Sequence, residues 1–319
     1  MKTIALKWTF FAGWLVSAGF ACSAGPLRLA DVPAEPAWVV HVDCDYLRAT
    51  DIGQYLLTQF QKPEIQAKLE AFTTIFNFDP RKDLHGFTLY SVGKSPEDGL
   101  LLLYADVDPA RLEVFARAAK DYKSASHNQH VIHSFIDDKR PAKDGVKPRT
   151  YASIVGTKLV VLSQREARVA GALDVLDKTA PNLSGSSGFP NLGAAGGSFA
   201  VEAAARKLDL SDSDPNAAVF RLAKLVRLQL GEAQHRLTGR LSLVANDEEV
   251  AGHILSVGQG LVSLAKLQQD KPEAARLAEA LSIKQQGSEV VATLSLPAGD
   301  VVEFMKTKAA RKAERENEK

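Results

Sequence analysis

The chain contains 319 residues, of which 45% are hydrophobic and 24% are charged. This ordinary globular composition excludes a collagen, a coiled coil or a disordered chain over most of the length. Lys and Arg total 39 against 38 Asp and Glu, so the chain lacks the strong positive charge that a nucleic-acid-binding protein normally carries. A chain of this length predicts two domains or one large domain.

The first 24 residues have the pattern of a secretory signal peptide. Lys2 and Lys7 make a basic start, the apolar run 8–21 follows, and small residues occupy 22–25. The apolar run is shorter than the about 20 residues that span a bilayer, and no later stretch reaches that length. We therefore expect cleavage after Ala24 and an exported bacterial protein, periplasmic or extracellular, without a transmembrane segment.

Cys22 gives an alternative fate for the N-terminus. Residues 19–22, Gly-Phe-Ala-Cys, have the position of a lipobox, whose cysteine is acylated and anchors the chain to a membrane. A lipobox usually has Leu at the place of Gly19 and a small residue at the place of Phe20. The sequence therefore favours cleavage after Ala24, with a lipoprotein anchored at Cys22 as the alternative.

The mature chain is predicted to have no intrachain disulfide. Cys44 is the one cysteine that follows the signal peptide. It ends the β-type run 38–44, which favours a buried, inert thiol over a nucleophile. An exported protein of this kind depends on its hydrophobic core for stability.

A first α+β domain is predicted at 37–180, after a Pro-rich leader at 25–36. Leu69, Phe72 and Ile75 recur at helical spacing and are expected to face a core. The expected strands cover 38–43, 86–92, 99–105, 130–136, 151–155 and 158–162. The expected helices cover 46–76 with a break at Pro63, 109–120 after Asp108 and Pro109, and 163–177.

A second α+β domain is predicted at 199–305. It follows a linker at 181–198 that is rich in Pro, Asn, Gly and Ser, and it precedes a charged, solvated tail at 306–319. The expected strands cover 199–203, 236–245, 282–286 and 289–296. The expected helices cover 217–230, 248–267 and 272–280, and a last helix begins at 300.

Short similarities between the halves indicate an internal duplication. Residues 84–89 parallel 237–243, and the Asp-x-Asp pairs 43–45 and 106–108 each follow a strand and precede a helix. The sequence therefore predicts an α+β fold of two related halves, each a mainly antiparallel sheet with its helices packed on one face.

The two Asp-x-Asp pairs are candidates for a metal site, because paired carboxylates suit hard cations such as calcium or magnesium. Asp43 and Asp106 are the candidate ligands. However, the residues after Asp43 lack the spacing of a calcium-binding loop. Capping of helices by Asp45 and Asp108 accounts for both pairs without a metal.

Three histidines lie close together at 127, 130 and 133, with Asp137 and Asp138 just beyond. Imidazole binds zinc or copper, which makes His130 and His133 candidate ligands. On a strand, however, residues three apart point to opposite faces of the sheet, which prevents them from sharing one metal. The pattern favours surface or pH-sensitive histidines.

Four segments together resemble an uncharacterised family of secreted bacterial proteins. They are 37–43 (Ala-Trp-Val-Val-His-Val-Asp), 83–90 (Asp-Leu-His-Gly-Phe-Thr-Leu-Tyr), 105–108 (Ala-Asp-Val-Asp) and 172–176 (Ala-Leu-Asp-Val-Leu). The resemblance covers most of the mature chain and is clearer in the first half. It implies export and an α+β layout, and it implies no activity, cofactor or catalytic residue.

Two functions remain open from the sequence. The preferred one is a non-catalytic secreted or envelope protein that binds a protein or a surface polymer, because no predicted constellation of residues is specific for catalysis. The alternative is an exported hydrolytic or metal-dependent enzyme whose site is assembled from scattered residues. Its candidate residues are His41, His85, His130, His133, Asp43 and Asp106.

Overall fold

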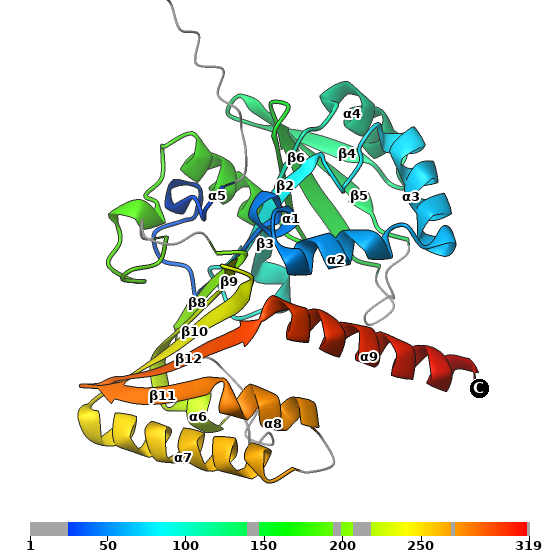
Figure 1. Ribbon diagram of the computed structural model, residues 1–319. Coiled ribbons are helices and arrows are strands. Elements are labelled where there is room, and N and C mark those ends of the chain that lie inside the picture. Colours follow the sequence, from blue (N-terminus) through cyan, green and yellow to red (C-terminus); the bar gives the residue numbers. More distant parts are fainter. Residues whose placement is uncertain (1–24, 139–146, 194–198, 207–217, 269–271, 318–319) are drawn as a thin grey trace, which may run out of the picture.

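The computed structural model describes residues 25–138, 147–193, 199–206, 218–268 and 272–317. The predicted signal peptide and Cys22 lie outside the described residues. In the part of the chain that is described, twelve strands form one antiparallel sheet in the order β11-β12-β10-β9-β8-β1-β2-β3-β7-β6-β5-β4 (Figure 1). The predicted α+β class is confirmed.

Groups of one to four strands alternate with helices along the chain. The strands are β1 Trp38–Asp43, β2 Leu84–Ser91, β3 Gly99–Ala105, β4 Lys123–His127, β5 His130–Ile136, β6 Arg149–Val155, β7 Leu159–Ser163, β8 Val201–Arg206, β9 Ala223–Ala233, β10 Arg236–Ala245, β11 Leu281–Gln286 and β12 Glu289–Pro297. The α-helices are α1 Cys44–Arg48, α2 Asp51–Gln59, α3 Pro63–Phe76, α4 Pro109–Ala118, α5 Glu166–Leu176, α6 Ala218–Arg221, α7 Glu248–Lys266, α8 Pro272–Glu279 and α9 Ala298–Asn317.

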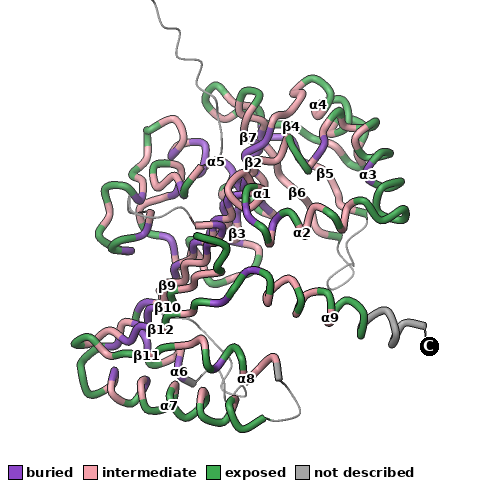
Figure 2. Tube along the Cα trace, in the orientation of Figure 1, coloured by how far each residue is buried: buried purple, intermediate pink, exposed green. Residues whose placement is uncertain are grey.

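The two expected halves share one continuous sheet. Strand β1 pairs with β2 on one side and with β8 on the other, and His41 is the partner of Glu202 in the second pair. The expectation of a separate sheet in each half is therefore corrected, because β8 extends the first sheet into the second. Burial is highest along this central region of the sheet (Figure 2).

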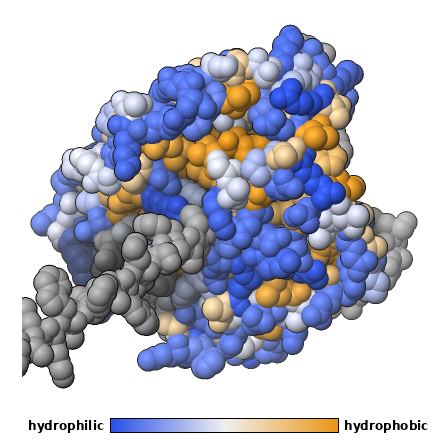
Figure 3. All heavy atoms as spheres, turned by 90° about the horizontal axis from the view of Figure 1, so that it is seen from above, coloured by the Kyte–Doolittle hydropathy of each residue, from blue (hydrophilic) through white to orange (hydrophobic). Residues whose placement is uncertain are grey.

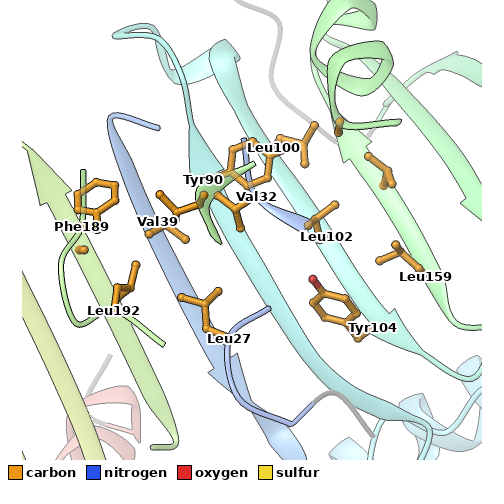
Figure 4. Packing of buried hydrophobic residues seen from close by; sticks show 14 of the residues in the cluster. Leu27, Val32, Val39, Tyr90, Leu100, Leu102, Tyr104, Leu159, Phe189 and Leu192 are labelled. Atoms are coloured by element: carbon orange, nitrogen blue, oxygen red, sulfur yellow. The ribbon is translucent and has the colours of Figure 1, made fainter. Parts of the chain in front are cut away.

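The described parts of the segments predicted as a leader and as a linker contribute side chains to the core. Leu27 and Val32 lie in the first segment, and Phe189 and Leu192 lie in the second. All four are buried in one cluster with Val39 of β1 (Figure 4). These few buried apolar side chains hold the Pro- and Gly-rich segments against the sheet. The composition of the segments indicates a leader and a linker, and it does not reveal these contacts.

The helix predicted over 217–230 is wrong for most of its length. A short helix, α6, is followed at once by strand β9. Lys, Leu, Arg and Gln are good helix formers, but the alternation of Leu228 and Leu230 with Arg227 and Gln229 places unlike side chains on opposite faces of a strand. Pairing with β8 and β10 overrides the helical propensity.

The predicted starts of helices α3 and α4 are confirmed, but the predicted buried face of α3 is mostly wrong. Helix α3 begins at Pro63, as predicted, and Asp108 caps α4 by accepting a hydrogen bond from the Arg111 backbone N at 3.1 Å. Leu69 is buried, whereas Phe72 and Ile75 are 40% and 45% exposed, so most of the face predicted to meet a core lies at the surface. Viewed from above, apolar patches are scattered among hydrophilic side chains (Figure 3).

The charged end of the chain continues a helix. Helix α9 packs along α2, where the Lys306 ammonium lies 5.6 Å from the centre of the Tyr55 ring. Arg311 forms an ion pair with Glu273 of α8 at 3.2 Å. Residues 308–311 are exposed, in agreement with a solvated end. Among the helices of the described ranges, none combines the length and apolar character that crossing a membrane requires.

Candidate functional site

Asp43 and Asp45, at the end of β1, form a helix cap and ion pairs. The Asp43 carboxylate accepts a hydrogen bond from the Tyr46 backbone N at 2.8 Å and caps α1. Its pKa is raised, mainly because burial disfavours the charged form. The predicted cap at Asp45 is therefore wrong by two residues. Asp45 instead pairs with Arg48 and with His85.

His85 and Asp106 come together, as members of an ion-pair network. His85 Nδ1 lies 3.0 Å from Asp45 Oδ2, and its Nε2 lies 3.1 Å from Asp106 Oδ1. Asp106 also binds Lys158, and this hydrogen bond is the main cause that lowers the Asp106 pKa. Both carboxylates are thus neutralised by cations, which suits a structural link between β2 and the ends of β1 and β3.

His41 is enclosed within the protein. Its side chain is 1% exposed, with Nδ1 2.9 Å from Thr88 Oγ1 and Nε2 3.1 Å from the Gly25 carbonyl oxygen. Burial lowers the His41 pKa and keeps the ring neutral at physiological pH. A substrate has no access to this ring.

The three neighbouring histidines bind separate partners. His127 Nε2 lies 2.8 Å from Asp174 Oδ1, and His130 Nε2 lies 2.9 Å from Asp177 Oδ1. His133 Nδ1 instead contacts the Tyr122 hydroxyl at 3.0 Å on the other face of β5. These histidines therefore do not form one ligand sphere. None of the six candidate residues for an enzyme lines the cavities described below.

A different group places three possible ligand atoms within 4.8 Å of one another: Asp51, Glu232 and His235. The Glu232 carboxylate already accepts hydrogen bonds from the backbone N of Asp51 and of Ile52 at 2.9 and 3.1 Å, so it caps α2. Asp51 binds His235 at 2.7 Å, at the exposed turn between β9 and β10. The group fastens this turn to α2.

Cys44 is half-buried beside the network of Asp45 and Arg48. Burial is the main cause that raises the pKa of its thiol to about 11. At neutral pH the thiol is protonated, and a thiol is a far weaker nucleophile than a thiolate. Its surroundings agree with the predicted inert cysteine.

The second half of the chain holds an apolar cavity between α7 and the sheet. Asp247 caps α7 by accepting a hydrogen bond from the Val250 backbone N at 2.8 Å. The first turns of the helix bury Ala251 and Ile254 against Leu243 and neighbouring core residues. From Leu255 to Lys266, no residue of α7 is buried. The second half of the helix therefore contributes no fully buried side chain to the core.

This second half of α7 and the sheet enclose a cavity of about 320 Å³. Apart from Arg240, its lining consists of apolar residues and glycines. These are Val219, Phe220, Leu228, Leu230, Gly239, Leu241, Leu243, Ile254, Gly258, Leu261, Val262, Leu281, Ile283, Val290, Ala292 and Leu294. The volume lies at the lower end of the range of about 300–1,000 Å³ that is typical of small-molecule sites.

Two glycines keep the cavity walls close. A Cβ atom at Gly239 would lie 3.0 Å from Leu230 Cδ2, and one at Gly258 would lie 3.3 Å from Ile283 Cδ1. The side chain of Arg240 belongs to the opposite face of the sheet, because it alternates along β10 with Leu241. The face that bounds the cavity is therefore apolar.

Apolar side chains continue from the cavity onto the surface of α7. Val257, Leu261 and Leu264 are 46%, 47% and 61% exposed and follow one another at helical spacing. Leu261 also lines the cavity. The cavity therefore opens beside an apolar strip, which suits the entry of an apolar ligand.

Sequence reasoning predicts helix 248–267 but not this cavity. The walls come from two helices, α6 and α7, and four strands, β9, β10, β11 and β12. Strand β9, one of the main walls, is predicted as a helix. The sequence signal that could have found it is the high number of leucine, isoleucine and valine residues at 254–267, more than one face of a helix needs.

The comparisons with known proteins give distant structural similarities. No protein-family model matches the chain, and no curated protein matches it. The chain is similar to crystal form III of TP0453, with a TM-score of 0.46, 9% identity, and coverage of 89% of this chain and 99% of that chain. Crystal forms IV and I of TP0453 each match with a TM-score of 0.44, 10% identity, and coverage of 89% of this chain and 98% of that chain. At these TM-scores the similarities define no function.

Proposed function

We propose that this chain is a non-catalytic secreted or envelope protein that binds an alkyl chain, or a similar apolar group, of an envelope component. The observation that carries the proposal is the apolar cavity between α7 and the sheet. Export is supported by the signal-peptide pattern of the first 24 residues and by the resemblance to secreted bacterial proteins.

The chemistry of the cavity favours binding over catalysis. Its walls of leucine, isoleucine and valine offer no titratable side chain to a reaction. The six residues considered for an exported enzyme lie outside this cavity and are engaged in caps, ion pairs and buried hydrogen bonds. An apolar ligand gains affinity in such a cavity by leaving water.

The length of the ligand provides a quantitative test. Each buried methylene contributes about 0.8 kcal/mol, which is roughly a fourfold increase in affinity. We therefore expect the affinity for linear alcohols to rise steadily with chain length and to level off once the cavity is full. Isothermal titration calorimetry of the mature protein with alcohols of about six to fourteen carbons measures this relation.

Two matched variants of α7 locate the site. Leu261→Asp places a charge in the wall of the cavity and is expected to weaken binding of a decyl alcohol at least tenfold. Leu267→Asp makes the same change at a position that is 75% exposed and does not line the cavity, so it is expected to leave binding unchanged. The proposal would be overturned if both variants bound the decyl alcohol with equal affinity, or if the affinity for alcohols did not depend on the length of the alkyl chain.

A further inference from the structure

A second cavity lies on the face of the sheet opposite α7. Directly paired residues of neighbouring strands project to the same face. The pairs Glu202↔Gln229 and Gln229↔Arg240 therefore make a polar row across β8, β9 and β10, while Leu228 and Leu241 point the other way. The row leads from the buried centre of the sheet to the exposed side chain of Arg240.

The cavity at the end of this row has a volume of about 250 Å³. Its lining is polar and contains two guanidinium groups but one carboxylate: Asn191, Arg227, Gln229, Arg240, Ser242 and Glu289. By the volume that liquid water occupies, this is space for roughly eight waters. The lining therefore carries one more positive charge than negative charge.

Most polar groups around the cavity already have partners. Glu202 Oε1 accepts hydrogen bonds from Gln229 Nε2 at 2.9 Å and from the Gly193 backbone N at 3.1 Å. Glu289 Oε1 accepts from Arg227 Nη2 at 2.7 Å and from the Ser242 hydroxyl. The one carboxylate of the lining is thus shared between Ser242 and Arg227.

One buried donor of the cavity remains without an acceptor. Arg227 Nε is buried and has no hydrogen-bond partner, although both terminal nitrogens of that guanidinium are bonded. Arg240 forms no ion pair with any described residue. A buried donor that lacks an acceptor is unfavourable and rare in folded proteins, and a bound ligand oxygen would satisfy it.

We propose that this cavity binds the oxyanionic group of a small molecule, a carboxylate or a phosphate. Both groups present several oxygens to guanidinium donors and form strong, charge-assisted hydrogen bonds with them. Arg240, at the open side, is the residue that would meet the anion first.

This inference is independent of the proposed alkyl-binding function. The two cavities lie on opposite faces of β9 and β10, and their linings share Arg240 alone. A linear alcohol carries no anion, and inorganic phosphate carries no alkyl chain. Either proposal can therefore fail without affecting the other.

The test is calorimetric titration of the mature protein with inorganic phosphate, sulfate and succinate, at an ionic strength held constant with sodium chloride. We expect saturable binding of at least one of these anions. Arg240→Gln should weaken this binding tenfold or more. Arg236→Gln is the matched control, because Arg236 lies on the same strand, is exposed, and is already bonded to Ser295 at 2.9 Å.

A chemical modification experiment tests the same site in the protein without substitutions. Modification of Arg240 by phenylglyoxal, followed by mass spectrometry, should slow in the presence of the bound anion, while modification of Arg236 should not. Binding of phosphate and sulfate without succinate would assign a phosphate-type ligand, and the reverse would assign a carboxylate. Absence of saturable binding, or equal loss in both variants, would overturn the inference.

Discussion

His41 Nδ1 lies 2.9 Å from Thr88 Oγ1 in the most buried part of the sheet, and the two residues are direct partners across β1 and β2. The contact fixes a neutral imidazole inside the core, because burial lowers the His41 pKa below its usual value near 6.5. This makes the stability of the fold sensitive to acid.

The sign of the effect follows from the proton balance. Below about pH 6.5 the unfolded chain takes up a proton at His41, whereas the folded protein does not until its own lower pKa is reached. Stability should therefore fall as the pH drops below 6.5, by up to about 1.4 kcal/mol per pH unit for this one group. Urea unfolding between pH 7 and 5 measures the slope.

His41→Gln should make this slope shallower, even if it also lowers the stability at pH 7. The remaining slope would come from other groups, including His133, whose pKa burial also lowers. A variant with the same slope as the original protein would show that His41 is protonated in the folded state.

The segment 182–193 should behave as core. Leu192 is 4% exposed and packs in the main hydrophobic cluster. Leu192→Ala should lower the free energy of unfolding by about 2–5 kcal/mol, as is typical when a buried leucine is truncated. Leu222→Ala, at a position 42% exposed, is the control and should cost much less. Equal costs in urea unfolding would argue for a true linker.

The sequence predicts best where a local signal fixes the backbone. Pro63 and the Asp108-Pro109 pair mark helix starts that the structure contains. The α+β class also follows from the alternation of strand and helix patterns. These signals act through sterics and capping within a few residues, so the rest of the fold has little influence on them.

Prediction fails where distant pairing decides the structure. Strand β9 has helix-forming residues, but its place between β8 and β10 makes Leu228 and Arg227 face opposite sides. The two cavities depend on this alternation, so neither could be seen before β9 was known to be a strand. Leu27 and Leu192 lie in Pro- and Gly-rich sequence segments, and only their contacts in the folded protein show that they belong to the core.

The last helix should divide into a docked part and a solvated part. Phe304 and Met305 are half-buried, and Arg276 lies over the Phe304 ring at 6.0 Å. Truncation after Thr307 should change the Tm by about 1 °C or less, because the first residues removed, 308–311, are exposed. Truncation after Glu303 should lower it by several degrees. Differential scanning calorimetry of both variants tests whether the boundary lies between these positions.

Cys44 should react slowly with thiol reagents in the folded protein. A thiol with a pKa of about 11 has about one thiolate per thousand molecules at pH 8. Alkylation by iodoacetamide at pH 8 should accelerate by at least tenfold when the protein is unfolded in guanidinium chloride. Equal rates in the two states would contradict the burial of this thiol.

The pairing of β1 with β8 means that the sheet can form only after β8 has been synthesised. His41 and Glu202 are direct partners although 161 residues separate them in the chain. A chain cut or halted before β8 would leave β1 as an open edge, with its backbone donors and acceptors unpaired and ready to join another copy. Folding to the native sheet therefore has to wait for the second half, and a truncated product should aggregate where the whole chain does not.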